Sequence, residues 1–248
     1  MAKRFDICDR FWMLGGAGFP FPVDTNTYWW DITSARNTVD TTGSPSISKL
    51  AELVRGESSF SQPVKSLQPL TTANGAAYTT TPGTGSNADV VIPANGADGA
   101  YWAANIKTDL LSPGSQTLFT IRNDADSTNT VIALLDADRL RLSSNEDNIG
   151  GATIAARAST VVAKNTWTTV EVMLKLGVAV GVWYNGVAQT LNATNTLTTA
   201  TFLTPSVSKV ILNDAFFGEM KDAVYYNGAI PAANRTSISD YLNAQRPI

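Results

Sequence analysis

The sequence predicts an all-β protein built as an antiparallel sandwich or barrel. Between residues 88 and 217, short segments rich in Val, Ile, Thr and aromatic residues alternate apolar and polar side chains with a period of two. Clusters of Gly, Asn, Asp and Pro separate these segments at roughly ten-residue spacing, which is typical of strands joined by turns rather than of βαβ units. Charged residues make up only 16% of the chain. Thr, Ser and Asn replace them, which favours β-sheet surfaces over helices.

Three further elements are predicted, one within this strand pattern and two outside it. Residues 46–56 predict a short helix, because a serine can cap an apolar stripe that ends at a glycine. Asn185 and Gly186 predict a tight hairpin turn, since both residue types accept the positive φ angles that such a turn requires. Residues 231–244 predict a C-terminal helix that begins at a proline and carries one apolar face.

The first thirty residues concentrate the aromatic side chains of the chain. Strings such as GGAG and FPFP lie between them and oppose both helix and regular strand. Two interpretations are open: the segment packs its aromatic rings onto its own domain, or it is an arm that lies on a neighbouring subunit. We therefore divide the chain into an N-terminal aromatic arm, residues 1–24, and a domain, residues 25–248. The anchoring side chains of the arm would be Phe5, Phe11, Trp12, Phe19 and Phe21.

Composition excludes several classes of site. The 248 residues include no histidine, which removes Ser-His-Asp and Cys-His catalysis and imidazole-bound metals. Cys8 is the only cysteine, so the chain can form neither an intrachain disulfide nor a thiolate metal cluster. The composition thus argues against an enzyme of these classes.

Two classes of partner are also disfavoured. The net charge of −3 provides no basic surface, so we expect no nucleic-acid partner. The most apolar run, residues 170–184, contains Glu171 and Lys175 and is too short to span a bilayer, so we expect no membrane insertion.

Several stretches resemble a known family. Residues 167–172 (WTTVEV) followed by residues 182–186 (VWYNG) resemble the W-x-x-V … Y-v-N-G hairpin of concanavalin A-like and laminin G-like domains. Residues 211–230 are similar to the closing strands of the same family, in which a glycine follows an aromatic residue and a later strand ends in Tyr-Asn. Residues 28–31 (YWWD) and 62–69 are similar to the opening of lectin-like domains in bacteriophage structural proteins.

The resemblance implies a fold and a set of functions. The fold would be a two-sheet antiparallel jelly-roll sandwich with an extended N-terminal arm and a short C-terminal helix. The protein would be a non-enzymatic structural component of a virion, as a head decoration, spike or tail protein. Its partners would be other virion subunits, and it would form a homo-oligomer such as a trimer. The alternatives are a carbohydrate-binding module for a host surface polysaccharide and a glycosidase of the same fold.

The glycosidase alternative requires carboxylates that the sequence does not supply in the family's pattern. Glycosidases that share this fold carry E-x-D-x-x-E on one strand, and Glu219 with Asp222 is the nearest approach here. Asp136 and Asp138 form the other carboxylate pair, and hydrolysis would need them on one face of a strand. We interpret them instead as part of a hairpin turn, where Asp bonds its own backbone.

Two groups of residues are candidates for glycan binding, which uses an exposed ring beside an amide or carboxylate. Tyr101 and Trp102 beside Asn105 form the first, and Trp183 with Tyr184 at the hairpin turn forms the second. Neighbours in a strand point to opposite faces, so at least one ring of each pair should face the core.

We expect no cofactor, and the alternative is a bound calcium ion. Calcium binds carboxylate, amide and carbonyl oxygens. A calcium site could draw on Asp124, Asp126, Asn145 and Asp147.

Overall fold

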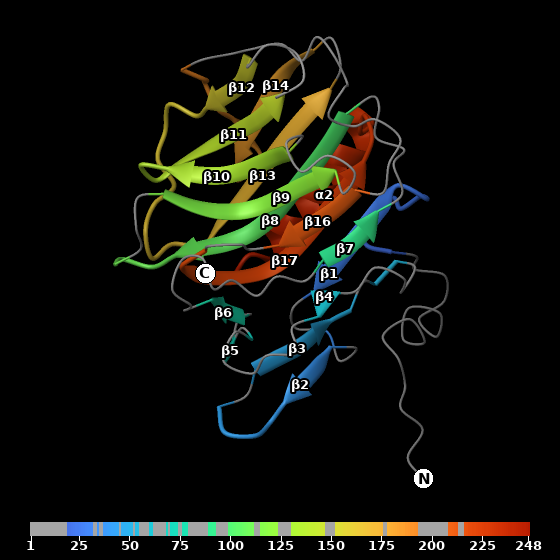
Figure 1. Cartoon of the computed structure of the whole chain (residues 1–248), viewed down its shortest axis with the longest axis vertical. Helices are drawn as coiled ribbons and strands as arrows, with labels where there is room; N and C mark the ends of the chain where they lie inside the picture. The colour runs from blue at the N-terminus through green and yellow to red at the C-terminus, as the bar shows by residue number, and fades with distance from the viewer. Residues whose placement is uncertain are drawn as a thin grey trace.

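In the part of the chain that the structure describes, the fold consists of two antiparallel β-sheets and a C-terminal helix, as the sequence predicts (Figure 1). The C-terminal helix, α2 (Ala232–Gln245), begins and ends one residue later than predicted. The computed structural model describes residues 19–31, 34, 37–44, 46–51, 53–54, 60–61, 68, 70–73, 76–78, 89–92, 99–111, 115–123, 130–146, 152–175, 178–192, 208–212 and 216–248.

The larger sheet has eleven described strands in the order β15-β14-β13-β8-β17-β6-β5-β3-β2, while β1 pairs with β17 and β4 pairs with β3. Its strands are β1 (Thr27–Asp31), β2 (Thr38–Asp40), β3 (Ser46–Leu50), β4 (Phe60–Ser61), β5 (Leu70–Thr71), β6 (Ala76–Tyr78), β8 (Gly99–Thr108), β13 (Thr168–Lys175), β14 (Val178–Tyr184), β15 (Val187–Ala188) and β17 (Gly218–Asn227).

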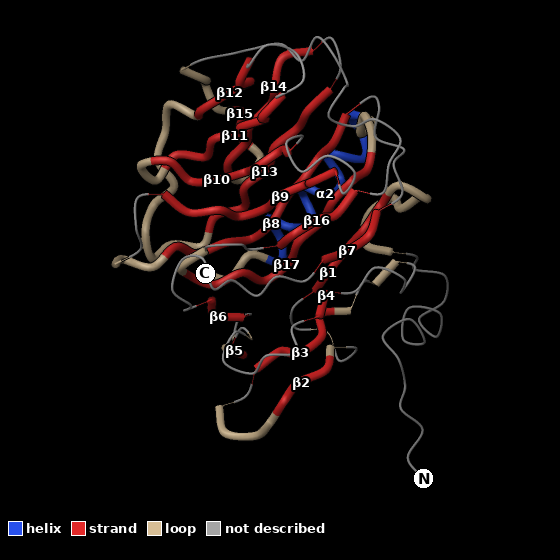
Figure 2. Tube along the Cα trace, in the orientation of Figure 1, coloured by secondary structure: helices blue, strands red, loops and turns tan. Residues whose placement is uncertain are grey.

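The smaller sheet has six described strands in the order β12-β11-β10-β9-β16-β7. These are β7 (Asp89–Ile92), β9 (Ser115–Asn123), β10 (Thr130–Asp136), β11 (Arg139–Glu146), β12 (Ala152–Arg157) and β16 (Ser208–Leu212). In Figure 2 this sheet lies in front of the central strands of the larger one, and α2, in blue, lies behind them.

The central strand β8 is covered on both faces. Trp102 and the residues that alternate with it point into the core between the sheets, where the Trp102 ring stacks on Phe119 of the smaller sheet at 5.4 Å. Tyr101 and Ala103 point the other way, into a second apolar cluster that includes Ile238 and Leu242 of α2. This double burial explains why β8 reads as an almost continuous apolar run rather than a strict alternation.

The helix predicted over residues 46–56 is wrong at its start, because Ser46–Leu50 forms β3. Three strands pair with β3, namely β2, β4 and β5. Ile47 is buried on one side, and on the other the buried Ser46 hydroxyl donates to Gln68 at 2.7 Å. These pairings satisfy the backbone of the segment, so tertiary context overrides the local helical pattern.

The hairpin predicted at Asn185 and Gly186 is confirmed. Their φ angles are +52° and +79°, and they join β14 to β15. Both residues of the turn therefore adopt the left-handed conformation that Asn and Gly tolerate.

The described end of the N-terminal arm packs on its own domain. Phe21 is 3% exposed and lies 5.4 Å from Trp29 and 5.2 Å from Tyr241, measured between ring centroids. Phe19 contacts Trp29 in the same cluster. Packing onto the domain itself is thus confirmed for Phe19 and Phe21, and the packed unit begins before residue 25. Phe5, Phe11 and Trp12 lie outside the described residues.

Candidate functional site

A groove of about 760 Å³ lies at one end of the larger sheet, beside the last turn of α2. Four segments that are distant in the sequence line it: the end of β8, the loop before β13, the β14–β15 turn and the residues that end α2. The side chains that give the groove its chemistry are Lys107, Asn165, Trp167, Asn185, Asn243 and Arg246.

Strand pairing places the floor of the groove. Thr168 pairs with Ile106, so the residue before β13, Trp167, lies next to Lys107 of β8. Trp167 is 7% exposed, and the Lys107 ammonium lies 5.7 Å from its ring centroid. The backbone amide of Asn165 donates to the Thr108 carbonyl at 2.7 Å and ties the loop to the end of β8. The Trp167 ring is therefore a buried floor rather than an exposed platform.

The opposite wall joins the hairpin turn to α2. The Asn185 side-chain oxygen accepts a hydrogen bond from the Thr169 amide at 2.9 Å and another from the Arg246 guanidinium. Arg246 also donates to the side-chain oxygen of Asn243 at 3.2 Å. The side-chain NH₂ of Asn243 in turn donates to the Ser239 carbonyl, one turn earlier in the helix, at 2.8 Å. These bonds fix the side-chain amides of Asn185 and Asn243 before a ligand binds.

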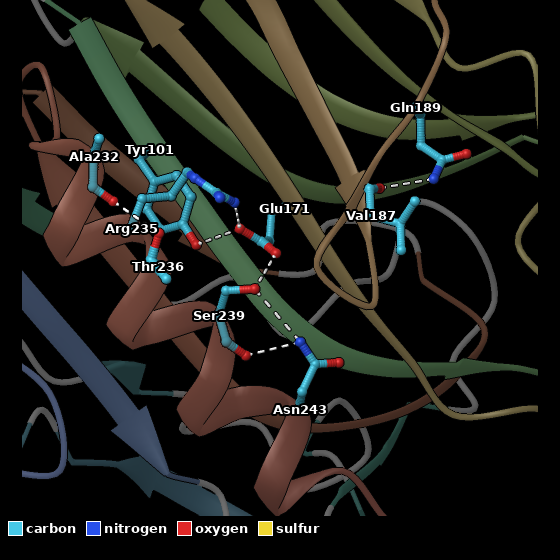
Figure 3. A network of polar contacts seen from close by, with 9 residues as sticks. All are labelled: Tyr101, Glu171, Val187, Gln189, Ala232, Arg235, Thr236, Ser239 and Asn243. Carbon is cyan, nitrogen blue, oxygen red and sulfur yellow. Dashed lines mark hydrogen bonds and ion pairs between the residues drawn. The ribbon is translucent and has the colours of Figure 1, made fainter.

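The helix itself is attached to the sheet by a buried carboxylate (Figure 3). Glu171 of β13 has no exposed surface. It accepts hydrogen bonds from the Tyr101 hydroxyl at 3.0 Å, the Ser239 hydroxyl at 2.7 Å and the Arg235 guanidinium at 2.9 Å. Burial and the neighbouring Glu171 charge raise the pKa of Tyr101 well above its usual value, so Tyr101 acts as a donor. This network sets the position of α2 and so of Asn243 and Arg246.

The first predicted glycan platform is wrong. Tyr101 and Asn105 have no exposed surface, and Trp102 is 2% exposed. Asn105 is used within the fold, where it accepts from the Thr169 hydroxyl at 2.7 Å and donates to the Leu242 carbonyl at 2.9 Å. The reason is that α2 covers one face of β8 and the smaller sheet covers the other.

The second predicted platform does not present two rings either. Tyr184 is buried, and its hydroxyl joins the sheets by accepting from the Leu140 amide at 2.8 Å and donating to the Thr160 carbonyl at 3.3 Å. Trp183 is half-buried under the Arg235 guanidinium, which lies 4.4 Å from its ring centroid. The ring also lies over Gly181, where a Cβ atom would overlap it. The hairpin contributes to the groove through Asn185 instead.

The aspartates Asp136 and Asp138 lie at a hairpin turn, as interpreted from the sequence. Asp136 ends β10 and Asp138 follows with a φ of +59°. Asp136 forms ion pairs with Arg141 and Arg157 at 3.4 and 3.3 Å, and Asp138 pairs with Lys164 at 3.6 Å. They are thus engaged in separate ion pairs around a turn.

The predicted calcium ligands Asp124, Asp126 and Asp147 lie outside the described residues, and Asn145 lies in β11. Within the described ranges, no three His, Cys, Asp or Glu side chains gather as a metal site would require. The calcium site stays a prediction. In the same ranges, no helix has the length and hydropathy needed to cross a bilayer.

Comparison with known proteins places the fold. No protein-family model and no curated protein sequence matches the chain. A Trypanosoma rangeli sialidase in complex with 2,3-difluorosialic acid matches with a TM-score of 0.57 at 12% identity, over 95% of this chain and 36% of that chain. A second structure of Trypanosoma rangeli sialidase matches with a TM-score of 0.54 at 10% identity, over 91% of this chain and 34% of that chain. The likeness is one of fold.

A shorter match also exists. Domain 4 of AbnA, a GH43 extracellular arabinanase from Geobacillus stearothermophilus in complex with arabinotriose, has a TM-score of 0.46 and 15% identity, over 73% of this chain and 81% of that chain. The chain spans about a third of the length of the sialidases it matches.

Sequence reasoning missed most of the groove. Lys107 and Asn165 are separated by long stretches of chain from each other and from Asn243 and Arg246, and no shared motif links them. Two signals pointed toward it: the Asn185-Gly186 turn and the tryptophan at residue 167. Neither indicates that the end of α2 closes the site.

Proposed function

We propose that the protein is a glycan-binding module that holds a saccharide in the groove at the end of α2. The observation that carries the proposal is the set of Asn165, Asn185 and Asn243 amides around the Trp167 floor. Sugar hydroxyls need donors and acceptors together, which an amide side chain supplies. The fold gives further support, because it recurs in a sialidase structure that holds a sialic acid derivative.

The module would bind its saccharide without turnover. Glycoside hydrolysis uses two carboxyl groups separated by roughly 5 to 9 Å across the scissile bond. The side chains that line the groove are amides, cations, hydroxyl, apolar and aromatic groups. This donor set supports recognition rather than acid-base catalysis.

A role in a virion is the finer form of this proposal. It rests on the resemblance of residues 28–31 and 62–69 to phage lectin-like domains, and it includes assembly with other virion subunits as a homo-oligomer. Tyr28, Trp29 and Trp30 are core residues of β1, so packing alone accounts for this aromatic string. Glycan binding and attachment to a particle are compatible. Truncation of the N-terminal arm tests the attachment.

A glycan array with two asparagine variants on α2 tests the proposed function. Asn243→Ala removes a groove amide near the end of the helix, and Asn234→Ala is the matched control near its beginning. We expect the wild type to bind a defined class of glycan. Asn243→Ala should weaken binding by about two- to tenfold, the contribution of one hydrogen bond, and Asn234→Ala should leave it unchanged. A wild type that binds no glycan, with an unchanged melting temperature in all three proteins, would contradict the proposal.

A further inference from the structure

We infer that the groove selects acidic saccharides, those that carry a carboxylate or a sulfate group, and that Arg246 is the residue that selects them. The inference rests on the proposed function and names the ligand class of the same site. It follows from the distribution of charge around the groove and from the partners of two cations.

The groove is basic in an acidic protein. The chain carries a net charge of −3, yet the charged side chains that line the groove are Lys107 and Arg246, and no lining side chain is acidic. A concave site lined by one sign of charge attracts ligands of the opposite sign. An anionic group on the ligand would therefore be favoured over a hydroxyl at the same place.

Arg246 has only neutral partners in the described structure. One nitrogen of its guanidinium, Nη1, donates to the side-chain oxygens of both Asn185 and Asn243. None of the ion pairs within the described ranges includes Arg246. A guanidinium has five N–H donors in a rigid fork, so donors remain for a ligand after these two bonds. That fork matches the paired oxygens of a carboxylate or sulfate.

The two amides also orient this fork. Asn185 is fixed by its bond from the Thr169 amide, and Asn243 is fixed by its bond to Ser239. Arg246 is half-buried rather than fully exposed, so its charge is less screened than that of a surface arginine. The guanidinium is therefore held in place before a ligand binds, which lowers the entropy lost on binding.

Lys107 differs because its charge is already paired. Its ammonium forms an ion pair with Glu219, whose other oxygen accepts from the Thr72 hydroxyl at 2.8 Å. The pair keeps Lys107 above the Trp167 ring. The specific contact with an anionic group therefore belongs to Arg246, which no ion pair within the described ranges includes.

A purely structural role for Arg246 is the alternative that the experiment must separate. An arginine that follows the last turn of a helix also interacts favourably with the helix dipole, and here it joins α2 to the hairpin. Loss of such a link would lower the stability of the protein and weaken the binding of all saccharides alike. Loss of a selecting group would remove the preference for acidic ligands while neutral ones bind as before.

The experiment measures binding of matched acidic and neutral saccharides to the full chain. The pairs are sialyllactose with lactose, oligogalacturonate with its methyl ester, and sulfated with desulfated galactan. For these measurements a short Gly-Ser extension is added after Ile248. Because Ile248 lines the groove, the extension moves the negatively charged terminal carboxyl group away from the site. The carboxylate pairs and the sulfate pair distinguish the two sources of negative charge. We expect the acidic member of at least one pair to bind about tenfold or more tightly than its neutral partner, and this ratio to fall as NaCl is raised.

Three variants complete the test. Arg246→Gln should reduce the acidic-to-neutral ratio to about one, and Arg246→Lys should keep part of it. Lys175→Gln removes an exposed positive charge at the far end of β13 and should leave the ratio unchanged. Equal binding of both members of every pair, or an Arg246→Gln variant that keeps the preference, overturns the inference and leaves the proposed function standing. Absence of binding to these probes and to the glycan array refutes the proposed function itself.

Discussion

Asp31 of β1 and Asp222 of β17 lie directly opposite each other in the larger sheet. Asp222 is 1% exposed, and its burial together with the Asp31 charge raises its pKa to about 7. The neighbouring Lys221 charge offsets part of this shift. Like charges directly opposite each other destabilise a strand pair. Asp222 is therefore a site where folding favours the protonated acid.

The first prediction concerns pH. Because the pKa of Asp222 rises from 3.8 in the unfolded chain to about 7 in the folded one, the folded state binds more protons between these values. Its contribution to stability is complete below pH 4 and is lost as the pH rises to 7, by on the order of 4 kcal/mol. Urea denaturation at pH 5 and pH 8 should show Asp222→Asn to be more stable than the wild type at pH 8, with a flatter dependence on pH.

The matched control for this prediction is Asp240→Asn, an exposed carboxylate on α2. It should keep the pH dependence of the wild type. If Asp222→Asn and the wild type lose stability in parallel between pH 5 and pH 8, Asp222 is not the group responsible.

The second prediction concerns the buried Glu171. Glu171→Ala leaves the Arg235 charge and the Tyr101 and Ser239 hydroxyls without their acceptor. We expect the free energy of unfolding to fall by about 3 to 5 kcal/mol. Hydrogen exchange should also quicken in α2. The control is Arg141→Ala, which breaks a partly exposed pair with Asp136 and should cost about 1 kcal/mol or less. Similar losses in the two variants would argue against an anchoring role for Glu171.

The third prediction concerns the link between the two sheets at Tyr184. Tyr184→Phe removes the acceptor of the buried Leu140 amide and the donor to Thr160. The expected loss is about 1 to 3 kcal/mol, the cost of an unsatisfied buried amide. Tyr226→Phe removes a partly buried hydroxyl that donates to Asp24 and should cost less. Chemical denaturation measures the free energy of unfolding of both variants. A larger loss for Tyr226→Phe than for Tyr184→Phe would contradict the prediction.

The fourth prediction concerns the N-terminal arm. A chain that lacks residues 2–18 retains Phe19 and Phe21 and should fold and bind glycan like the full chain. Removal of residues 2–22 exposes the cluster around Trp29 and Tyr241 and should lower stability by about 2 kcal/mol or more, as expected for a buried phenylalanine. Thermal unfolding of the two truncations checks this. If the shorter deletion already unfolds the domain, residues 2–18 belong to its core. If it folds but no longer joins a virion, the arm is the attachment segment.

Local patterns predicted the elements whose formation depends on neighbouring residues. The period of two in the strands, the left-handed turn at Asn185 and Gly186 and the C-terminal helix are of this kind. The strand β3 is not, because its helical pattern is outweighed by backbone pairing with the separate strands β2, β4 and β5.

The groove and the buried platform show a second limit. Alternation in β8 separates its two faces but does not reveal that α2 covers Tyr101 and Asn105. The groove depends on strand register, which places Trp167 beside Lys107, and on the length of α2, which brings Arg246 to Asn185. Such relationships between distant segments have no signature in a short window of sequence.

The pairing of β1 with β17 has a kinetic consequence. Thr27 pairs with Tyr226, about 200 residues later, and β8 is flanked by β13 and β17, which both follow it in the chain. During synthesis, the aromatic residues of β1 must wait for β17 to emerge before the two strands can pair. Contacts of such long sequence separation slow folding and leave apolar strands exposed in the meantime. Refolding of this protein should accordingly be slow and sensitive to protein concentration, and fusion to a partner that keeps β1 soluble should raise its yield.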